Sequence, residues 1–189
     1  MLQTPRERFV PPSKRSVAYA GEAVEIAKNR WLLDPRVFAK MVDFAEIEPT
    51  DSVLDVGCGL GYSSAILSQI CRAVIAIESD EAMAKTAEDT LASLGRDNVA
   101  VLTGEMALGA PSEQPYEVIL VQGGIAAPPK ALFDQLVEGG RLVAIWMDGG
   151  SFGRAQISVK SGDNVSTRWA FDAAAPVLPG FEAAPSFAF

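Results

Sequence analysis

Three glycines separated by single residues, Gly57, Gly59 and Gly61, follow a short apolar run in the first half of the chain. Glycine permits positive φ and lets a ligand approach the backbone closely. A helical pattern over residues 63–70 comes next, so the loop would present free backbone N–H groups at the beginning of a helix. This arrangement predicts a binding loop for a nucleotide-like ligand.

The spacing of these glycines differs from that of two common phosphate-binding loops. The dinucleotide fingerprint G-x-G-x-x-G would place its third glycine where this chain has Tyr62. The loop G-x-x-x-x-G-K-[ST] is absent, and no lysine lies nearby. We therefore expect a nucleoside without phosphates rather than a pyrophosphate or a triphosphate.

Two acidic residues accompany the glycines. Asp55 stands two residues before Gly57, and Glu78 ends the next apolar run. The separation of the two acids is close to the spacing of about 20 residues expected for a carboxylate that binds ribose hydroxyls. The alternative is a tight turn in another kind of α/β protein, with Glu78 as a solvated strand end.

The length and net charge of the chain limit the classes of protein to which it can belong. The chain has 189 residues and a net charge of −8, which predicts one domain with a full core and argues against nucleic acid as a partner. No apolar run is long enough to span a membrane, and the first residues do not form an apolar signal segment. We therefore expect a cytoplasmic protein that does not bind membranes, and the sequence leaves its oligomeric state open.

The chain has no histidine and two cysteines, Cys58 and Cys71. A Ser-His-Asp triad, a Cys-His pair and histidine metal ligation are excluded, and two cysteines alone do not form a zinc site. We expect no metal, and we expect both thiols to be packing residues in a reducing compartment. The chemistry must then come from a substrate that carries its own nucleophile or from a reactive cofactor.

Strand and helix patterns alternate between residues 35 and 146. This alternation predicts an α/β fold with a doubly wound, mostly parallel sheet, whose ligands bind at the carboxyl ends of the strands. Glu78, Glu105 and Gln122 stand at such ends. The expected helices cover residues 35–48, 63–70, 80–94 and 128–136, and the expected strands cover residues 53–56, 74–78, 99–102, 116–121 and 141–146.

The two ends of the chain have other patterns. Residues 13–31 lack periodicity and are expected to form extended or loop structure packed over a site, and an upstream segment is expected to be missing. Alternation over residues 155–159 and 165–171 predicts an antiparallel hairpin on the sheet edge. The tail from residue 173 to residue 189 is expected to lie over the surface, with disorder as the alternative. We divide the single domain, 1–189, into an N-terminal substrate-side segment and helix (1–48), a cofactor-binding core (51–146), and a C-terminal hairpin and tail (153–189).

The core resembles class I S-adenosylmethionine-dependent methyltransferases with a Rossmann-like fold. More narrowly, the chain is similar to the protein-L-isoaspartate O-methyltransferase family, whose members take part in protein repair. The matching residues are Val53 to Tyr62, Ile77-Glu78, residues 94–99, 115–121 and 132–142, Pro5 to Pro11, Ala18-Tyr19 and Pro35.

The resemblance implies S-adenosyl-L-methionine as cofactor. Gly57 to Gly61 would hold its amino acid part, Asp55 would orient that loop and the cofactor's amino group, and Glu78 would bind the ribose diol. Glu105 stands where the family has an aspartate near the adenine, and Gln122 replaces small residues that line the methyl-transfer site. The full set expected at the cofactor is Asp55, Gly57, Cys58, Gly59, Gly61, Tyr62, Glu78, Ser79, Gly104, Glu105, Met106 and Gln122.

The departure from the family lies just before Pro35. The family has a Thr-x-Ser-x-Pro pattern whose hydroxyls help to hold the substrate carboxylate. This chain has Trp31 and Leu33 at those positions and Asp34 before the proline, so these three are the candidate residues of the substrate pocket. Asp34 is expected to cap the helix rather than face the pocket. Since each lost partner of a buried anion costs about 1–3 kcal/mol, isoaspartyl activity is expected to be weak, altered or lost.

The expected chemistry suits a protein without histidine. A carboxylate that attacks a sulfonium methyl is already ionised near neutral pH, so it needs alignment rather than a general base, and we assign no catalytic residue. The expected substrate is a peptide or protein carboxylate, such as an L-isoaspartyl residue, or a small molecule. The alternatives are a methyltransferase for a different small-molecule, tRNA or protein acceptor, and a cofactor-binding module that has lost activity.

Overall fold

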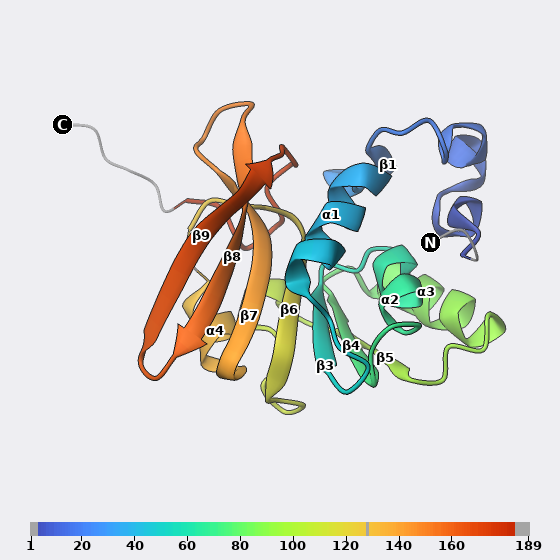
Figure 1. Cartoon of the computed structure of the whole chain (residues 1–189). Helices are drawn as coiled ribbons and strands as arrows, with labels where there is room; N and C mark the ends of the chain where they lie inside the picture. The colour runs from blue at the N-terminus through green and yellow to red at the C-terminus, as the bar shows by residue number, and fades with distance from the viewer. Residues whose placement is uncertain (1–3, 128, 184–189) are drawn as a thin grey trace.

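The computed structural model describes residues 4–127 and 129–183. Its centre is a seven-stranded sheet with the order β5-β4-β3-β6-β7-β8-β9 (Figure 1). The five strands from β3 to β7 are parallel to one another, and β8 and β9 continue the sheet antiparallel. This topology confirms the predicted doubly wound sheet and the predicted C-terminal hairpin.

The elements of the sheet and its helices have the following bounds. The strands are β3 (Ser52–Val56), β4 (Ala73–Glu78), β5 (Val99–Thr103), β6 (Tyr116–Ile125), β7 (Leu136–Met147), β8 (Gly153–Ser161) and β9 (Asn164–Asp172). The helices are α1 (Pro35–Ala45), α2 (Tyr62–Leu67), α3 (Glu81–Ser93) and α4 (Lys130–Asp134), with a short 3-10 turn, η3 (Met106–Leu108). None of the helices in the described residues is long and apolar enough to cross a membrane.

Alternate residues of the central strands pack on opposite faces of the sheet. Val53 belongs to the core cluster that contains residues of α1, α2 and α3. Its neighbour Leu54 belongs to the cluster on the other face, with residues of α4, η3 and the C-terminal segment. Because successive strand side chains point to opposite faces, both faces of β3 are buried. Parallel pairing of β3 with β4 and with β6 brings the carboxyl ends of these three strands side by side.

Helix α1 begins where the sequence predicts. The Asp34 side chain accepts a hydrogen bond from the Arg36 backbone N–H at 2.7 Å, and Pro35 is the first helical residue. This is an N-cap, and such caps contribute about 1 kcal/mol. The helix ends at Ala45, before the predicted stop at Pro49, because Glu46 adopts the left-handed conformation.

The N-terminal segment has more regular structure than predicted. It contains two 3-10 helices, η1 (Arg6–Phe9) and η2 (Pro12–Val17), and a two-stranded hairpin made of β1 (Val24–Ala27) and β2 (Arg30–Leu32). The turn of this hairpin uses Asn29 at φ 58°. Since the two strands have only four and three residues, they are too short to give a readable alternation.

Buried Arg6 anchors η1. Its Nε donates to the Ala18 carbonyl at 2.8 Å and its Nη2 to the Leu33 carbonyl at 2.7 Å. Its guanidinium carbon lies 4.7 Å from the centre of the Tyr62 ring. Burial lowers the pKa of Arg6, and the Tyr62 side chain opposes that shift. The N-terminal segment is thus fixed to the beginning of α2.

The C-terminal segment runs over the surface, as predicted, and a few buried side chains anchor it there. Ala175, Leu178 and Phe181 are buried. The segment runs beside the end of β6, where Gly124 N–H donates to the Pro176 carbonyl at 2.8 Å and Leu178 N–H donates to the Gly124 carbonyl at 2.9 Å. Because most side chains of residues 173–183 are exposed, this part agrees with the prediction of a tail over the surface, and residues 184–189 lie outside the described part of the chain.

The predicted bounds of α4 and β7 also need a correction. The helix ends at Asp134 and β7 begins at Leu136, whereas the sequence predicts a helix through that leucine and a strand from Arg141. Leu136 pairs with Tyr116 before the register shifts toward Arg141. Pro128, expected to open the helix with Pro129, lies outside the described residues.

Candidate cofactor site

The glycine turn connects β3 to α2. Gly57, Gly59 and Gly61 have φ values of 79°, 58° and 94°. L-residues with side chains rarely adopt such values, which explains why glycine stands at each position. Gly57 N–H donates to the Ile77 carbonyl of β4 at 2.8 Å, and Gly61 N–H donates to the Cys58 carbonyl at 2.9 Å. The turn is therefore closed on itself and fixed to the neighbouring strand.

Asp55 is fully buried beneath this turn. Its Oδ2 accepts hydrogen bonds from the hydroxyls of Ser63 and Ser64, both at 2.6 Å, and its Oδ1 accepts one from Gln122 Nε2 at 2.7 Å. Burial raises the pKa of the Asp55 carboxyl, while these three hydrogen bonds oppose the shift. One carboxylate thus joins the end of β3 to α2 and β6.

The sequence predictions missed the two serines. Their position directly after the last glycine was the available signal, because side chains at the beginning of such a helix face the preceding strand end. Gln122 was predicted at the site, and the structure brings its amide to the same carboxylate.

Glu78 is fully buried at the end of β4. Its Oε2 accepts a hydrogen bond from Gly59 N–H at 2.8 Å, and its Oε1 accepts from the N–H groups of Ser79 at 2.8 Å and Asp80 at 3.2 Å. The carboxylate therefore holds the glycine turn against β4. Its position supports the prediction that the two acids belong to one site.

An arginine from the N-terminal hairpin binds the Glu78 carboxylate. Arg30 Nη1 pairs with Glu78 Oε1, and Arg30 Nη2 donates to Glu78 Oε2 at 2.6 Å and to the Gly57 carbonyl at 3.3 Å. The Arg30 side chain is only 6% exposed. The sequence predictions missed this contact, because no spacing or periodicity links residue 30 to residue 78.

Apolar side chains fill the space beside this ion pair. A Cβ placed on Gly59 would lie 2.6 Å from Ile26 Cδ1, and one on Gly57 would lie 2.8 Å from Leu178 Cδ1. A Cβ on Gly123 would lie 2.6 Å from Leu178 Cγ. The hairpin and the C-terminal segment thus both pack on the glycine turn.

The cavity that remains over the turn is small. Its volume is about 10 Å³, roughly what one water molecule needs. Predicted cofactor residues and predicted substrate-pocket residues share its lining. The lining residues are Ile26, Trp31, Leu32, Leu33, Phe38, Gly57, Cys58, Gly59, Tyr62, Ser63 and Gln122.

Other predicted site residues lie around this cavity or away from it. Met106 is buried, with its sulfur 3.4 Å from the place that a Gly57 Cβ would take. Gly104 N–H donates to the Glu78 carbonyl at 3.0 Å, while the Glu105 side chain is exposed and does not cap η3. Asp34 caps α1 and is absent from the cavity lining, in agreement with the expected cap.

The two thiols are buried, as expected for packing residues. Burial raises the pKa of Cys58 well above its usual value, and the nearby Asp55 and Glu78 carboxylates add to the shift. Burial also raises the pKa of Cys71, to about 11. Neither thiol is thereby suited to act as a nucleophile near neutral pH.

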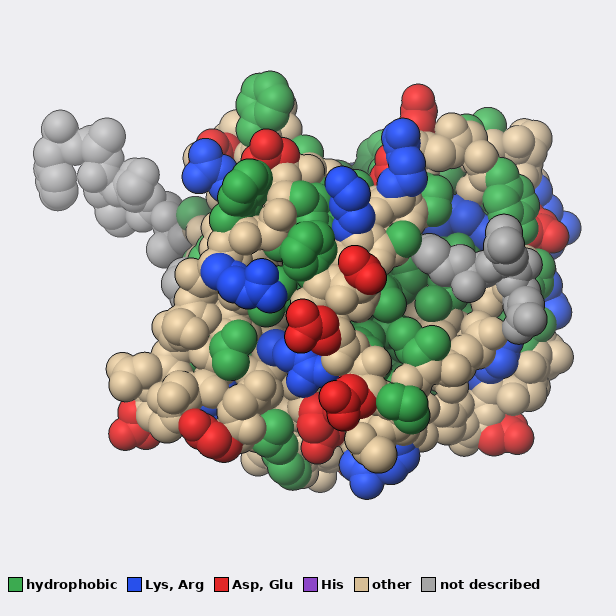
Figure 2. Space-filling model, viewed as in Figure 1, with side chains coloured by type: hydrophobic (Ala, Val, Ile, Leu, Met, Phe, Trp, Pro, Cys, Tyr) green, Lys and Arg blue, Asp and Glu red, His purple; other side chains and the backbone are tan. Residues whose placement is uncertain are grey.

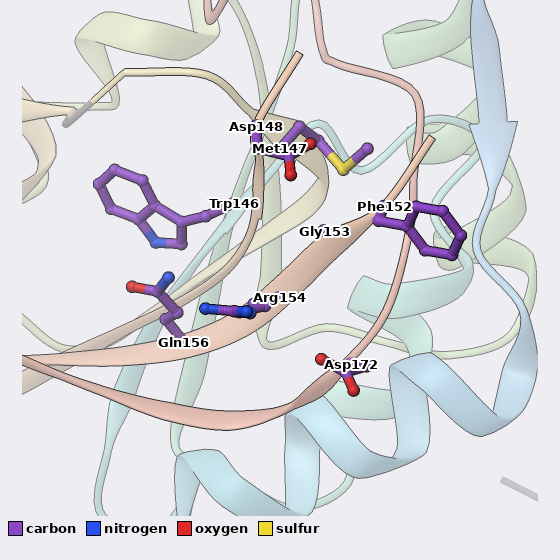
Figure 3. Close-up of a pocket in the computed structure, with 8 residues that line it drawn as sticks. All are labelled: Trp146, Met147, Asp148, Phe152, Gly153, Arg154, Gln156 and Asp172. Carbon is purple, nitrogen blue, oxygen red and sulfur yellow. The ribbon is translucent and has the colours of Figure 1, made fainter. Parts of the chain in front are cut away.

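A larger cavity of about 570 Å³ lies at the junction of β7 and β8. Figure 3 shows Trp146, Arg154 and Gln156 close together, and Phe152 and Asp172 farther to the right of the view. No residue predicted for the cofactor or substrate pocket lines this cavity.

Figure 2 shows hydrophobic side chains gathering over α1 and α2, and acidic side chains along the lower edge of the same face.

The sheet order, the glycine turn and the acid at the end of β4 define a Rossmann-like methyltransferase fold. Among solved structures, a protein-L-isoaspartate O-methyltransferase aligns over 95% of this chain and 59% of its own, with a TM-score of 0.82 and 24% identity. A candidate enzyme of that kind from Plasmodium falciparum, in complex with S-adenosyl-L-homocysteine, aligns over 94% of this chain and 87% of its own, with a TM-score of 0.72 and 18% identity.

The family is shown by the sequence itself. The family model for protein-L-isoaspartate(D-aspartate) O-methyltransferase matches residues 1–168, so the chain belongs to this family. Protein-L-isoaspartate O-methyltransferase from Roseiflexus castenholzii is 41% identical over 143 residues, which are 76% of this chain and 66% of that protein. Protein-L-isoaspartate O-methyltransferase 2 from Pelobacter propionicus is 41% identical over 143 residues, or 76% and 64%. The aligned part thus spans just under two thirds of the length of these relatives.

Proposed function

We propose that this chain is an S-adenosylmethionine-dependent methyltransferase that transfers a methyl group to a carboxylate. The first acceptor to test is the free carboxylate of an L-isoaspartyl residue in a protein. The observation that carries the proposal is the pair of buried carboxylates, Asp55 and Glu78, at the two sides of the glycine turn. The bound cofactor would supply an electrophilic methyl group. The family to which the chain belongs supports the same reaction.

The residues present suit this cofactor, although the space between them is filled. Glu78 offers two carboxylate oxygens for ribose hydroxyls, and the turn from Gly57 to Gly61 offers the backbone approach that its amino acid part requires. Asp55 fixes the turn through α2 and positions Gln122 at the end of β6. Ile26, Arg30 and Leu178 fill the volume, so binding requires these three side chains to withdraw.

The acceptor side is less polar than the family pattern implies. Trp31, Leu33 and Phe38 line the small cavity over the turn, and Leu33 is 4% exposed. No hydroxyl at positions 31 or 33 can donate to an acceptor carboxylate. This observation favours a second candidate, in which the preferred acceptor is a less polar small molecule or protein group.

The test uses an isoaspartyl peptide and cofactor carrying a labelled methyl group. Formation of a labelled methyl ester on this peptide, and not on the matched aspartyl peptide, supports isoaspartyl methylation. Loss of ester formation in Glu78→Ala ties the reaction to the cofactor site. Absence of labelled ester on the peptide, with transfer to an apolar carboxylate, selects the second candidate, and absence of transfer to either acceptor contradicts the proposal.

Restoring the family hydroxyls gives a matched gain-of-function test. The double variant Trp31→Thr/Leu33→Ser places hydroxyls where the family has them. Because each buried anion partner is worth about 1–3 kcal/mol, kcat/KM for the isoaspartyl peptide is expected to rise at least tenfold. An unchanged value would show that these two positions do not face the acceptor.

A further inference from the structure

The contact between Arg30 and Glu78 uses the oxygens that the proposed cofactor needs. A carboxylate offers about four acceptor positions. Gly59, Ser79 and Asp80 donate backbone N–H groups to Glu78, and Arg30 donates from both terminal nitrogens. These bonds saturate the carboxylate. A ribose diol therefore cannot bind Glu78 until the guanidinium has left.

The side chains beside Arg30 obstruct the same place. Ile26 comes from the other strand of the hairpin and lies against Gly59, while Leu178 lies against Gly57. The cavity left over the turn has a volume of about 10 Å³. A nucleoside is many times larger, so the conformation described excludes the cofactor by volume as well as by hydrogen bonding.

The hairpin that carries Arg30 is attached separately from the main sheet. Strands β1 and β2 form their own two-stranded sheet and pair with none of the seven central strands. An isolated two-stranded hairpin is marginally stable by itself. The exposed Lys28 and Asn29 form its turn, so the buried contacts of Val24, Ile26 and Arg30 hold it in place. The hairpin can thus separate from the glycine turn while the sheet stays intact.

One nitrogen of Arg30 is left without a hydrogen bond to the described part of the chain when the hairpin is closed on Glu78. Its Nε is buried and has no hydrogen-bond partner in the described residues. A buried donor without a partner is costly. Withdrawal of the hairpin would hydrate this atom, which offsets part of the loss of the ion pair.

We propose that Arg30 is an internal competitor for the cofactor's ribose, so that the β1–β2 hairpin closes the empty site and must leave Glu78 when the cofactor binds. This inference rests on the proposed function. The apparent affinity for the cofactor is then lowered by the fraction of molecules in which the hairpin is closed. Removing the guanidinium raises the open fraction and the affinity.

The first experiment measures binding of S-adenosylhomocysteine, which has no methyl group to transfer, by calorimetry on the full chain. Arg30→Met keeps most of the length of the side chain and removes its charge. Lys28→Met is the matched control, because it removes an exposed charge from the turn of the same hairpin. Arg30→Met is expected to bind at least tenfold more tightly than wild type, and Lys28→Met is expected to bind as wild type does.

The second experiment needs no substitution. Hydrogen exchange of residues 23–33 in the wild-type protein is expected to become faster when S-adenosylhomocysteine is added. Slower exchange there would overturn the inference, since it would mean that the hairpin closes over the ligand rather than leaving it.

The outcomes separate this inference from the proposed function. Binding by Arg30→Met alone, with none by wild type, supports both. Binding by wild type that Arg30→Met leaves unchanged or weakens overturns the inference and leaves the proposed function in place. No binding by either protein, or binding that Glu78→Ala does not weaken, overturns the cofactor assignment and the inference with it.

Discussion

The buried ion pair between Arg30 and Glu78 predicts a particular pattern of stability. In Glu78→Ala, Arg30 would remain buried with the Gly57 carbonyl, at 3.3 Å, as its hydrogen-bond acceptor. Removing one partner of a buried pair typically costs about 3–5 kcal/mol. The cost has an upper limit, because a hairpin that detaches lets Arg30 reach water. We therefore expect a loss of about 2–5 kcal/mol in the free energy of unfolding.

Arg30→Met is expected to cost less than Glu78→Ala. Glu78 would keep its hydrogen bonds from the N–H groups of Gly59, Ser79 and Asp80, so its charge would remain partly compensated. The double variant Glu78→Ala/Arg30→Met leaves no unpaired charge, and its loss is expected to be smaller than the sum of the single losses. Residues in direct contact show coupling energies of about 0.5–3 kcal/mol.

Urea unfolding, followed by circular dichroism, measures these four proteins under one set of conditions. Equal m-values would show that the variants expose the same surface on unfolding. A loss below about 1 kcal/mol for Glu78→Ala, with additive effects in the double variant, would refute the reasoning. It would mean that the two side chains do not meet in solution and that the hairpin is already open.

Three further predictions concern the helix cap at Asp34, the buried carboxyl of Asp55 and the thiol of Cys71. Asp34→Ala is expected to lower the free energy of unfolding by about 1 kcal/mol through loss of the cap, with unchanged affinity for S-adenosylhomocysteine; a large change in affinity would place Asp34 at the ligand. Burial raises the pKa of Asp55, so the folded protein keeps this proton to higher pH than the unfolded chain. The stability that Asp55 contributes is thus greatest below its unfolded pKa of about 3.9 and falls as the pH rises through the folded pKa. Asp55→Asn should lack this dependence, and identical slopes of stability against pH in the two proteins would contradict it. Cys71, whose pKa is raised to about 11, should react with a thiol reagent at pH 8 far more slowly in folded protein than in urea, and equal rates would show that it is exposed.

The glycine turn and both carboxylates could be predicted because their signals are local. A strand, three glycines and a helix stand next to one another, and Glu78 ends the following strand. The N-cap at Asp34 was readable for the same reason, since proline stands beside it. These features depend on neighbours in the sequence, and the structure places them together.

The sequence predicted that residues 13–31 pack over the site, but the particular contacts that fill it could not be predicted. Arg30 lies in a strand of three residues, and nothing in its surroundings indicates that it would reach Glu78. Leu178 stands in an Ala/Pro-rich stretch that resembles a surface tail, yet it is 3% exposed against Gly57 and Gly123. Such contacts depend on how distant segments meet in the folded chain, which hydrophobic periodicity does not report.

The position of Leu178 has a consequence for the order of events during synthesis. The glycine turn is translated early, whereas the leucine that packs on it follows the last strand of the sheet. Strands β3, β4 and β6 are therefore translated while their turn is still uncovered on that side. Docking of the C-terminal segment comes late, so truncating Leu178 should mainly accelerate unfolding and leave the rate of folding nearly unchanged. A nascent chain would thus leave the Leu178 side of the turn uncovered, while Ile26 and Arg30 could already pack on the other side.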